Sequence, residues 1–127
     1  LAESHTILPV LPTARPIMPI SAPAVPGAAE AVRQAGRRDV KVMGLSLPNM
    51  NKTYVHADVV QKVILWNTTN LGYLTVLAAA KTVDGTLASG ATSLAAGRLG
   101  TIEVRGQEIV LGDPLVMDKG NIDRFDF

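Results

Sequence analysis

The chain has 127 residues, a length that allows one ordinary domain and excludes two full ones. Because 47% of the residues are hydrophobic and 18% are charged, we expect a packed core, and the composition excludes a disordered chain. The formal net charge of +1 comes without a basic stripe or aromatic platform, which argues against nucleic acid as a partner.

The absence of cysteine excludes disulfides, thiol catalysis and cysteine-ligated zinc. No stretch approaches the roughly 18 consecutive apolar residues that a membrane-spanning helix needs, so we expect no membrane insertion.

Prolines dominate the first segment of the chain. Residues 1–16 contain prolines at positions 9, 12 and 16, a spacing that disfavours a helix or a central strand. We therefore predict an extended, polyproline-like arm. The chain begins with leucine rather than methionine and has no signal-peptide pattern, which indicates a processed chain, a fragment or a laboratory-made piece.

A strand and a helix follow the arm. Residues 17–22 form a short apolar run that predicts a strand interrupted by Pro19. Pro26 suits a first helical turn, and the alanine-rich segment after it predicts a helix that Gly36 ends. Arginines and a lysine cluster in residues 33–41, where cations interact favourably with the helix dipole.

Two apolar runs that stop abruptly on polar residues come next. Residues 40–49 and 60–67 each predict a buried strand, joined by a polar loop over residues 48–58. Ligands bind at the carboxyl ends of strands in open α/β sheets. The two ends therefore predict a cleft for a small polar molecule.

The second half of the chain alternates between a helix and short extended pieces. Thr69 is expected to cap a helix over residues 70–83, which Asp84 and Gly85 end. The residues that follow predict a loop over 86–100, a hairpin from 101–104 and 108–111, an extended piece over 115–117 and a final turn over 121–125 with Asp118 or Asn121 as its cap. The order of elements predicts an α/β fold with a partly parallel sheet.

Four side chains have a chemical interpretation besides a structural one. Ser46 lies in Gly-Leu-Ser-Leu-Pro, which differs from the nucleophile elbow by proline in place of the second glycine, so a hydrogen bond to a ligand or to the following turn is favoured over nucleophilic catalysis. His5 and His56 lack the carboxylate spacing of a metal site, and we expect surface histidines. Trp66 either stacks on a sugar or fills a gap in the core.

Several segments resemble one known family. They are IMPISAPAVPGAAEA (17–31), VMGLSLPN (42–49), LWN (65–67), LGYL (71–74), AGRLG (96–100) and DKGNIDRFDF (118–127). Together they resemble the C-terminal part of type I periplasmic sugar-binding proteins of ABC importers, in the branch of rhamnose-binding and autoinducer-2-binding (LsrB-like) proteins. The stretches LWN, LGYL and AGRLG are closer to the rhamnose type.

The resemblance implies an α/β fold of two Rossmann-like lobes, of which only a C-terminal portion is present. It divides the chain into the arm (1–16), which does not look like the family's upstream helix and strand, a C-terminal-lobe βαβ portion with a hinge strand (17–66), a segment of the N-terminal lobe plus the hairpin (67–112) and a return to the C-terminal lobe (113–127). The implied ligand-binding residues are Ile20, Ser21, Ala22, Ser46, Trp66 and Asn67.

By this resemblance the chain is part of a periplasmic component that binds a small sugar such as rhamnose without chemistry, cofactor or metal, and delivers it to an ABC permease. The alternatives are the ligand-sensing domain of a transcription regulator and an autoinducer-2 receptor of the same fold. An enzyme that uses Ser46 is a further alternative. Apolar surface left by the missing lobe favours a homo-oligomer.

Overall fold

The computed structural model describes residues 2–127. The chain divides into two compact units, each with its own core. We call residues 2–65 with 115–127 the first unit, and residues 66–114 the second unit.

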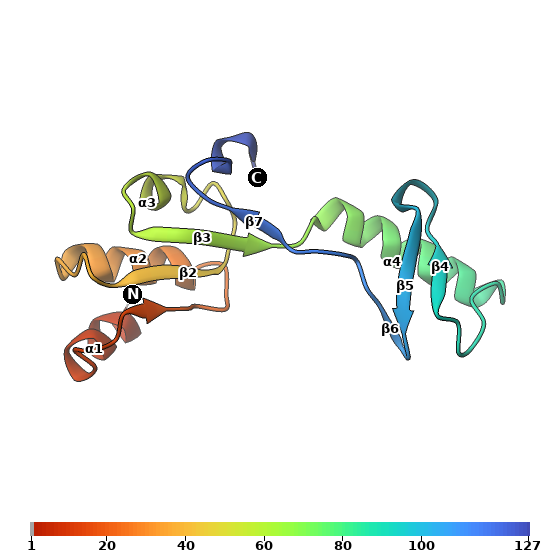
Figure 1. The fold of residues 1–127 in the computed structure, drawn as a ribbon, viewed down its shortest axis with the longest axis horizontal. Coiled ribbons are helices and arrows are strands. Elements are labelled where there is room, and N and C mark those ends of the chain that lie inside the picture. The colour runs from red at the N-terminus through yellow and green to blue at the C-terminus, as the bar shows by residue number, and fades with distance from the viewer. Residues whose placement is uncertain (1) are drawn as a thin grey trace. The chain divides into compact units, whose positions relative to one another are not determined.

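The first unit is built on a four-stranded mixed sheet (Figure 1). Its strands are β1 (Pro16–Ile17), β2 (Lys41–Leu45), β3 (Val60–Leu65) and β7 (Leu115–Met117), in the order β1-β2-β3-β7. β1, β2 and β3 run parallel, and β7 pairs antiparallel with β3. This confirms the predicted α/β fold with a partly parallel sheet. β1 is shorter than the predicted run of residues 17–22 because Pro19 has no N–H with which to continue the ladder.

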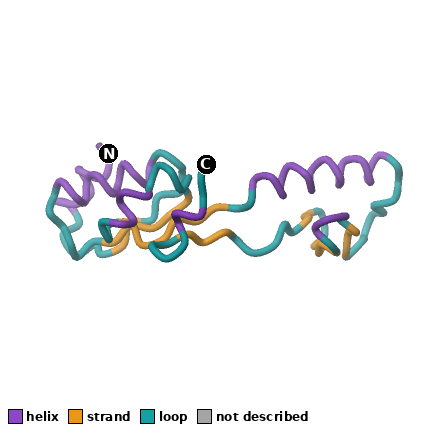
Figure 2. Tube along the Cα trace, turned by 90° about the horizontal axis from the view of Figure 1, so that it is seen from above, coloured by secondary structure: helices purple, strands orange, loops and turns teal. Residues whose placement is uncertain are grey.

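Three helices belong to the first unit: α1 (Ala2–Val10), α2 (Ala24–Gln34) and α3 (Lys52–His56). Figure 2 shows them gathered on one side of the strands. The core between the helices and the sheet is made of Leu8, Val25, Ala28, Ala29, Ala31, Val32, Val40, Val42, Val55, Val60, Val63, Leu65, Met117 and Ile122. The small alanines of α2 let its backbone approach the sheet closely.

The predicted extended arm is wrong, because α1 forms in spite of Pro9. Pro9 lies in the last turn, where its ring removes one helical hydrogen bond, and the chain still closes a further turn with Leu11 N–H donating to Ile7 C=O at 2.8 Å. Leu8 is 4% exposed within the core, and His5 Nε2 lies 3.0 Å from Gln34 Oε1 of α2. Tertiary packing outweighs the local cost of the proline.

The predicted end of α2 at Gly36 is confirmed. Gly36 has φ of +64°, a conformation that glycine adopts without a steric penalty. Gly36 N–H donates to Arg33 C=O, and Arg37 N–H donates to Val32 C=O, each at 3.2 Å. These two bonds form a Schellman motif, which satisfies the last carbonyls of the helix with backbone donors.

The predicted loop over residues 48–58 is wrong in part, because it contains α3. Asn51 and Lys52 N–H both donate to the carbonyl of Pro48, at 2.9 and 3.0 Å, and this turn leads into the helix. Val55 is buried in the core against the sheet. One apolar side chain in a single helical turn leaves no periodicity to detect.

The second unit contains α4 (Thr68–Val83) and an antiparallel sheet in the order β4-β5-β6. Its strands are β4 (Ser93–Ala95), β5 (Thr101–Arg105) and β6 (Glu108–Ile109), and Leu74, Leu94, Ala96 and Ile102 are its buried hydrophobic residues. The predicted helix over 70–83 and the predicted hairpin are confirmed.

The predicted loop over residues 86–100 is wrong in part, because it contains β4 and a 3₁₀ turn at Gly97–Leu99. Leu94 opposes Ile102 of β5, and both side chains are buried. A single large apolar residue among small ones gives no alternating pattern, so the strand depends on this partner.

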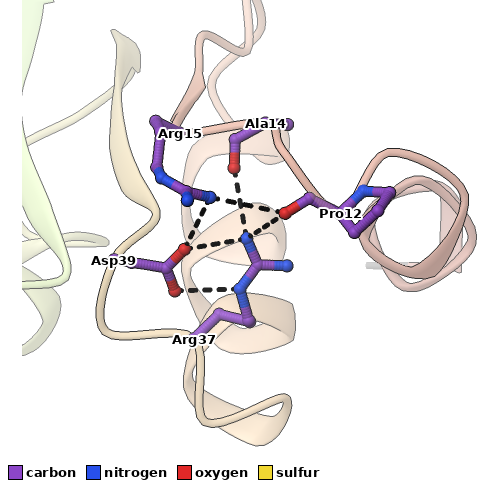
Figure 3. Close-up of polar contacts among 5 residues, drawn as sticks. All are labelled: Pro12, Ala14, Arg15, Arg37 and Asp39. Carbon is purple, nitrogen blue, oxygen red and sulfur yellow. Dashed lines mark hydrogen bonds and ion pairs between the residues drawn. The ribbon is translucent and has the colours of Figure 1, made fainter.

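An arginine clamp ties the N-terminal segment to the loop between α2 and β2 (Figure 3). Arg37 Nη2 donates to the carbonyls of Pro12 and Ala14 at 3.0 and 3.3 Å, and its Nε and Nη2 bind the Asp39 carboxylate at 2.8 and 2.9 Å. Arg15 Nη1 lies 2.9 Å from the same carboxylate. The Arg37 hydrogen bonds are the main reason that the pKa of Asp39 falls to about 2.

We predict that Arg37→Gln raises the pKa of Asp39 from about 2 toward its ordinary value of 3.8, because the largest stabilisation of the carboxylate is removed. A carboxyl with a lowered pKa stabilises the fold above its ordinary pKa, and this contribution is lost as pH falls through the folded pKa. The free energy of unfolding of the variant should therefore change less with pH between 3.8 and about 2 than that of the wild type. Carbon-13 NMR titration of the Asp39 carboxyl measures the shift.

Arg105→Gln is the matched control, because Arg105 pairs with Glu103 in the second unit. It should leave the Asp39 titration unchanged. An Asp39 pKa that stays near 2 in Arg37→Gln would contradict the clamp.

A close approach at Gly44 holds the segment after β1 against β2. A Cβ atom at Gly44 would overlap the Pro19 carbonyl oxygen and lie 3.0 Å from Val25 Cγ2. We predict that Gly44→Ala destabilises the first unit by about 1–3 kcal/mol, the usual cost of overpacking. Hydrogen exchange at the Leu45 and Ser46 amides, which bond to Pro19 and Ile64, measures the loss.

Gly72→Ala is the control, and it should change the free energy of unfolding in the opposite direction. Gly72 lies inside α4 and a Cβ there meets nothing within 4 Å, so alanine should stabilise the helix by roughly 0.5–1 kcal/mol. Equal protection of β2 in wild type and Gly44→Ala would show that the approach has no energetic importance.

Candidate functional site

The carboxyl ends of β1 and β2 lie at one edge of the first sheet. Because the two strands are parallel neighbours, the segment after β1 and the segment after β2 leave the sheet on the same side. Leu45 N–H donates to Pro19 C=O at 3.2 Å, and Ser46 Oγ donates to Ala22 C=O at 2.6 Å. The structure therefore brings two of the predicted site residues, Ala22 and Ser46, into direct contact.

Ile20 and Ser21 present a different surface at this edge. The Ile20 side chain is 84% exposed, unusual for a large aliphatic residue, and Ser21 is also exposed. Ser21 C=O accepts a hydrogen bond from Ala24 N–H at 3.0 Å, which fixes the segment where α2 begins. The exposed side chains are thus held on an ordered backbone, and neither is charged.

Ser46 is fully buried, with its hydroxyl committed to the fold. Besides donating to Ala22 C=O, Ser46 Oγ accepts a hydrogen bond from Asn51 Nδ2 at 2.7 Å. This arrangement ties the segment after β1 to the turn that leads into α3. Contact between the Ser46 hydroxyl and a ligand would require exchange of one of these two bonds.

Asn51 is the residue at this edge that the sequence did not single out. It is fully buried, and its Nδ2 also donates to Leu47 C=O at 2.8 Å. Among residues 2–127 no donor reaches its Oδ1 atom. Asn51 directly precedes α3, at the position where asparagine commonly caps a helix, although its side chain makes no cap hydrogen bond here; this position was the available signal.

The nucleophile hypothesis for Ser46 has no base to support it in the described part of the chain. His5 bonds to Gln34, and His56 Nε2 lies 3.0 Å from Asp123 Oδ1. Both histidines are exposed, as expected for surface residues. A buried serine without a histidine partner lacks the proton acceptor that an activated hydroxyl needs.

Trp66 and Asn67 lie in the second unit, where the chain enters α4. The Trp66 side chain is 41% exposed, so it does not simply fill a core gap. Asn67 Oδ1 accepts a hydrogen bond from Asn70 N–H at 2.8 Å and caps α4, so the predicted cap at Thr69 is wrong. Asn67 lies two positions before Thr69 and accepts the same kind of bond, so the capping residue of such a polar run cannot be identified from residue type alone.

No cluster of three or more potential metal ligands occurs within residues 2–127. In the same residues, no helix combines the length and apolarity needed to cross a bilayer.

No model of a known protein family matches the chain, and neither does any curated protein. Solved structures do match. A sugar ABC transporter protein from Actinomyces odontolyticus has a TM-score of 0.81 and 26% identity over 99% of this chain. A solute-binding protein from Clostridium phytofermentas with bound L-rhamnose has a TM-score of 0.82 and 26% identity over 97%. LsrB from Clostridium saccharobutylicum, in complex with AI-2, has a TM-score of 0.79 and 20% identity over 99%.

This chain has the fold of the type I periplasmic sugar-binding proteins. It spans about two fifths of each of them, since the matches cover 41, 43 and 44% of their lengths. A match over 99% of the chain includes nearly all of the N-terminal segment, so the expectation that residues 1–16 depart from the type I fold is wrong.

We predict that Ser46→Ala destabilises the first unit by about 1–3 kcal/mol, because it leaves the half-buried Ala22 carbonyl and the buried Asn51 amide each short of a partner. Urea unfolding measures the change, with the exposed Ser89→Ala as the matched control. Wild-type stability in Ser46→Ala would contradict the structural role of this hydroxyl.

Proposed function

We propose that this chain is the C-terminal portion of the sugar-binding component of a bacterial ABC importer, with L-rhamnose or a related deoxy sugar as its ligand. The observation that carries the proposal is the similarity, over 97% of the chain, to a solute-binding protein whose structure contains L-rhamnose. The rhamnose assignment fits the LWN, LGYL and AGRLG stretches of the sequence.

The proposed ligand contacts are the uncharged side chains that the sequence resemblance implied. Ile20, Ser21, Ala22 and Ser46 would bind from the first unit, with Ser46 acting chiefly through the loops that it fixes. Trp66 and Asn67 would bind from the second unit. These side chains carry no charge, which suits a neutral ligand, and an exposed aliphatic group such as Ile20 suits the methyl group of a deoxyhexose.

We propose residues 17–66 and 113–127 as parts of the C-terminal lobe, and residues 67–112 as part of the N-terminal lobe. The complete protein would act in the periplasm, bind without chemistry and deliver its ligand to an ABC permease. The transcription-regulator alternative has less support, because a match named as a LacI transcriptional regulator, from Bacteroides fragilis, has a TM-score of 0.59 and 15% identity, against 0.82 and 26% for the solute-binding protein with L-rhamnose. Val76 and Val83, exposed on α4, are candidates for self-association.

Calorimetric titration with L-rhamnose tests the ligand. For this chain we expect saturable but weak binding, with Kd in the millimolar range, about −4 kcal/mol, because only part of the fold is present. A longer chain of the length of the structural relatives should bind far more tightly. Absence of saturable heat from both chains would contradict the proposal, and nanomolar affinity of this chain alone would contradict its description as a portion.

The double role of Asn67 allows a sharper test in the longer chain. Asn67→Asp keeps an oxygen that caps α4 but loses the amide N–H donors, so affinity should fall about five- to tenfold without loss of helix stability. Asn70→Asp makes the same chemical change three residues later and is the matched control. Equal affinity of both variants would remove Asn67 from the ligand contacts.

A further inference from the structure

A groove of about 500 Å³ lies in the first unit at the amino ends of β2 and β3. Since β2 spans five residues, the groove is separated from the carboxyl edge by roughly 16 Å. It therefore differs from the proposed sugar site. Its lining comes from residues within 32–41 and from residues 57–59.

Most charges that line the groove are already paired. Arg33 pairs with Glu30 at 2.6 Å, Arg37 pairs with Asp39 at 2.8 Å, and Asp58 pairs with Lys119 at 2.8 Å.

Two cations remain. Within residues 2–127, no carboxylate lies within 4.0 Å of Arg38 or Lys41, and Lys41 Nζ reaches only the Asp58 backbone carbonyl, at 3.4 Å. The groove thus has a surplus of two positive charges.

Interaction with the end of α2 does not account for this surplus. The Schellman motif supplies backbone N–H groups to the carbonyls of Val32 and Arg33, and in the described chain no basic side chain bonds to a carbonyl of α2. The dipole of α2 contributes roughly half a negative charge at this end. The positive charge of Arg38 and Lys41 together is larger than this half charge.

The floor of the groove is apolar. Val32 and Val40 are buried and Val59 is half-buried, and these valines line the groove together with the cations. A volume of about 500 Å³ is within the range of small-molecule sites. Apolar walls also reduce the competition of water for a charged group.

We propose that this groove binds a small organic anion, with its phosphate or carboxylate group held by Arg38 and Lys41 and its body against the half-buried Val59. Guanidinium and ammonium groups form the short charge-assisted bonds that such oxyanions accept. The concave apolar floor favours a molecule of this kind over a flat anionic surface.

The test is an NMR titration of this chain with inorganic pyrophosphate and, separately, with citrate. We expect saturable amide shifts confined to residues 33–41 and 57–59, with millimolar Kd for at least one probe. The probe that binds more tightly identifies phosphate or carboxylate as the preferred group. Absence of saturation with both probes would overturn the proposal.

The double variant Arg38→Gln/Lys41→Gln should weaken binding at least about tenfold, because both charge partners of the anion are lost. Arg124→Gln/Lys81→Gln removes the same charge elsewhere and should change Kd less than about twofold. An equal loss in both variants would show non-specific attraction and overturn the site. Unchanged binding in the first variant would also overturn it. The amide spectra of the free variants report whether each is folded.

Discussion

The absence of a side chain at Gly44 is the constraint on which the carboxyl edge of the first sheet depends. Only a glycine lets the Pro19 carbonyl lie this close to the backbone of β2 near its carboxyl end. That contact puts the segment after β1 within reach of Ser46, whose hydroxyl then joins Ala22 to Asn51. The two segments of the edge are thereby fixed by buried hydrogen bonds, which confer order on exposed side chains such as Ile20.

Elements with periodic apolar residues or a strong stop signal were predictable from the sequence. The apolar face of α2 and its glycine stop, the long run of α4 and the hairpin of β5 and β6 all carry such local signals. The elements that escaped prediction depend on distant partners. α1 forms against α2 despite Pro9, β4 needs Ile102 opposite Leu94, and α3 has one buried turn.

The residues of the candidate site also separate into those with a local sequence signal and those without one. The sequence located the strand ends, because abrupt changes from apolar to polar residues are local. It did not show that Ser46 faces inward, since a hydroxyl suits a ligand and a buried network equally well. Asn51 was missed because its hydrogen-bond partners, Ser46 and Leu47, lie in the turn between β2 and α3, whose conformation no apolar pattern marks.

The second unit is inserted between two paired strands of the first unit. Leu65, the last residue of β3, and Leu115, the first of β7, are partners in the antiparallel ladder. Residues 66–114 therefore form an insertion into a single β-hairpin, with both attachment points about 5 Å apart. A short type I′ turn between Leu65 and Leu115 would close that hairpin. The strand order of the first sheet therefore does not depend on the length of the inserted segment, and the second unit could be lengthened, replaced or deleted without changing it.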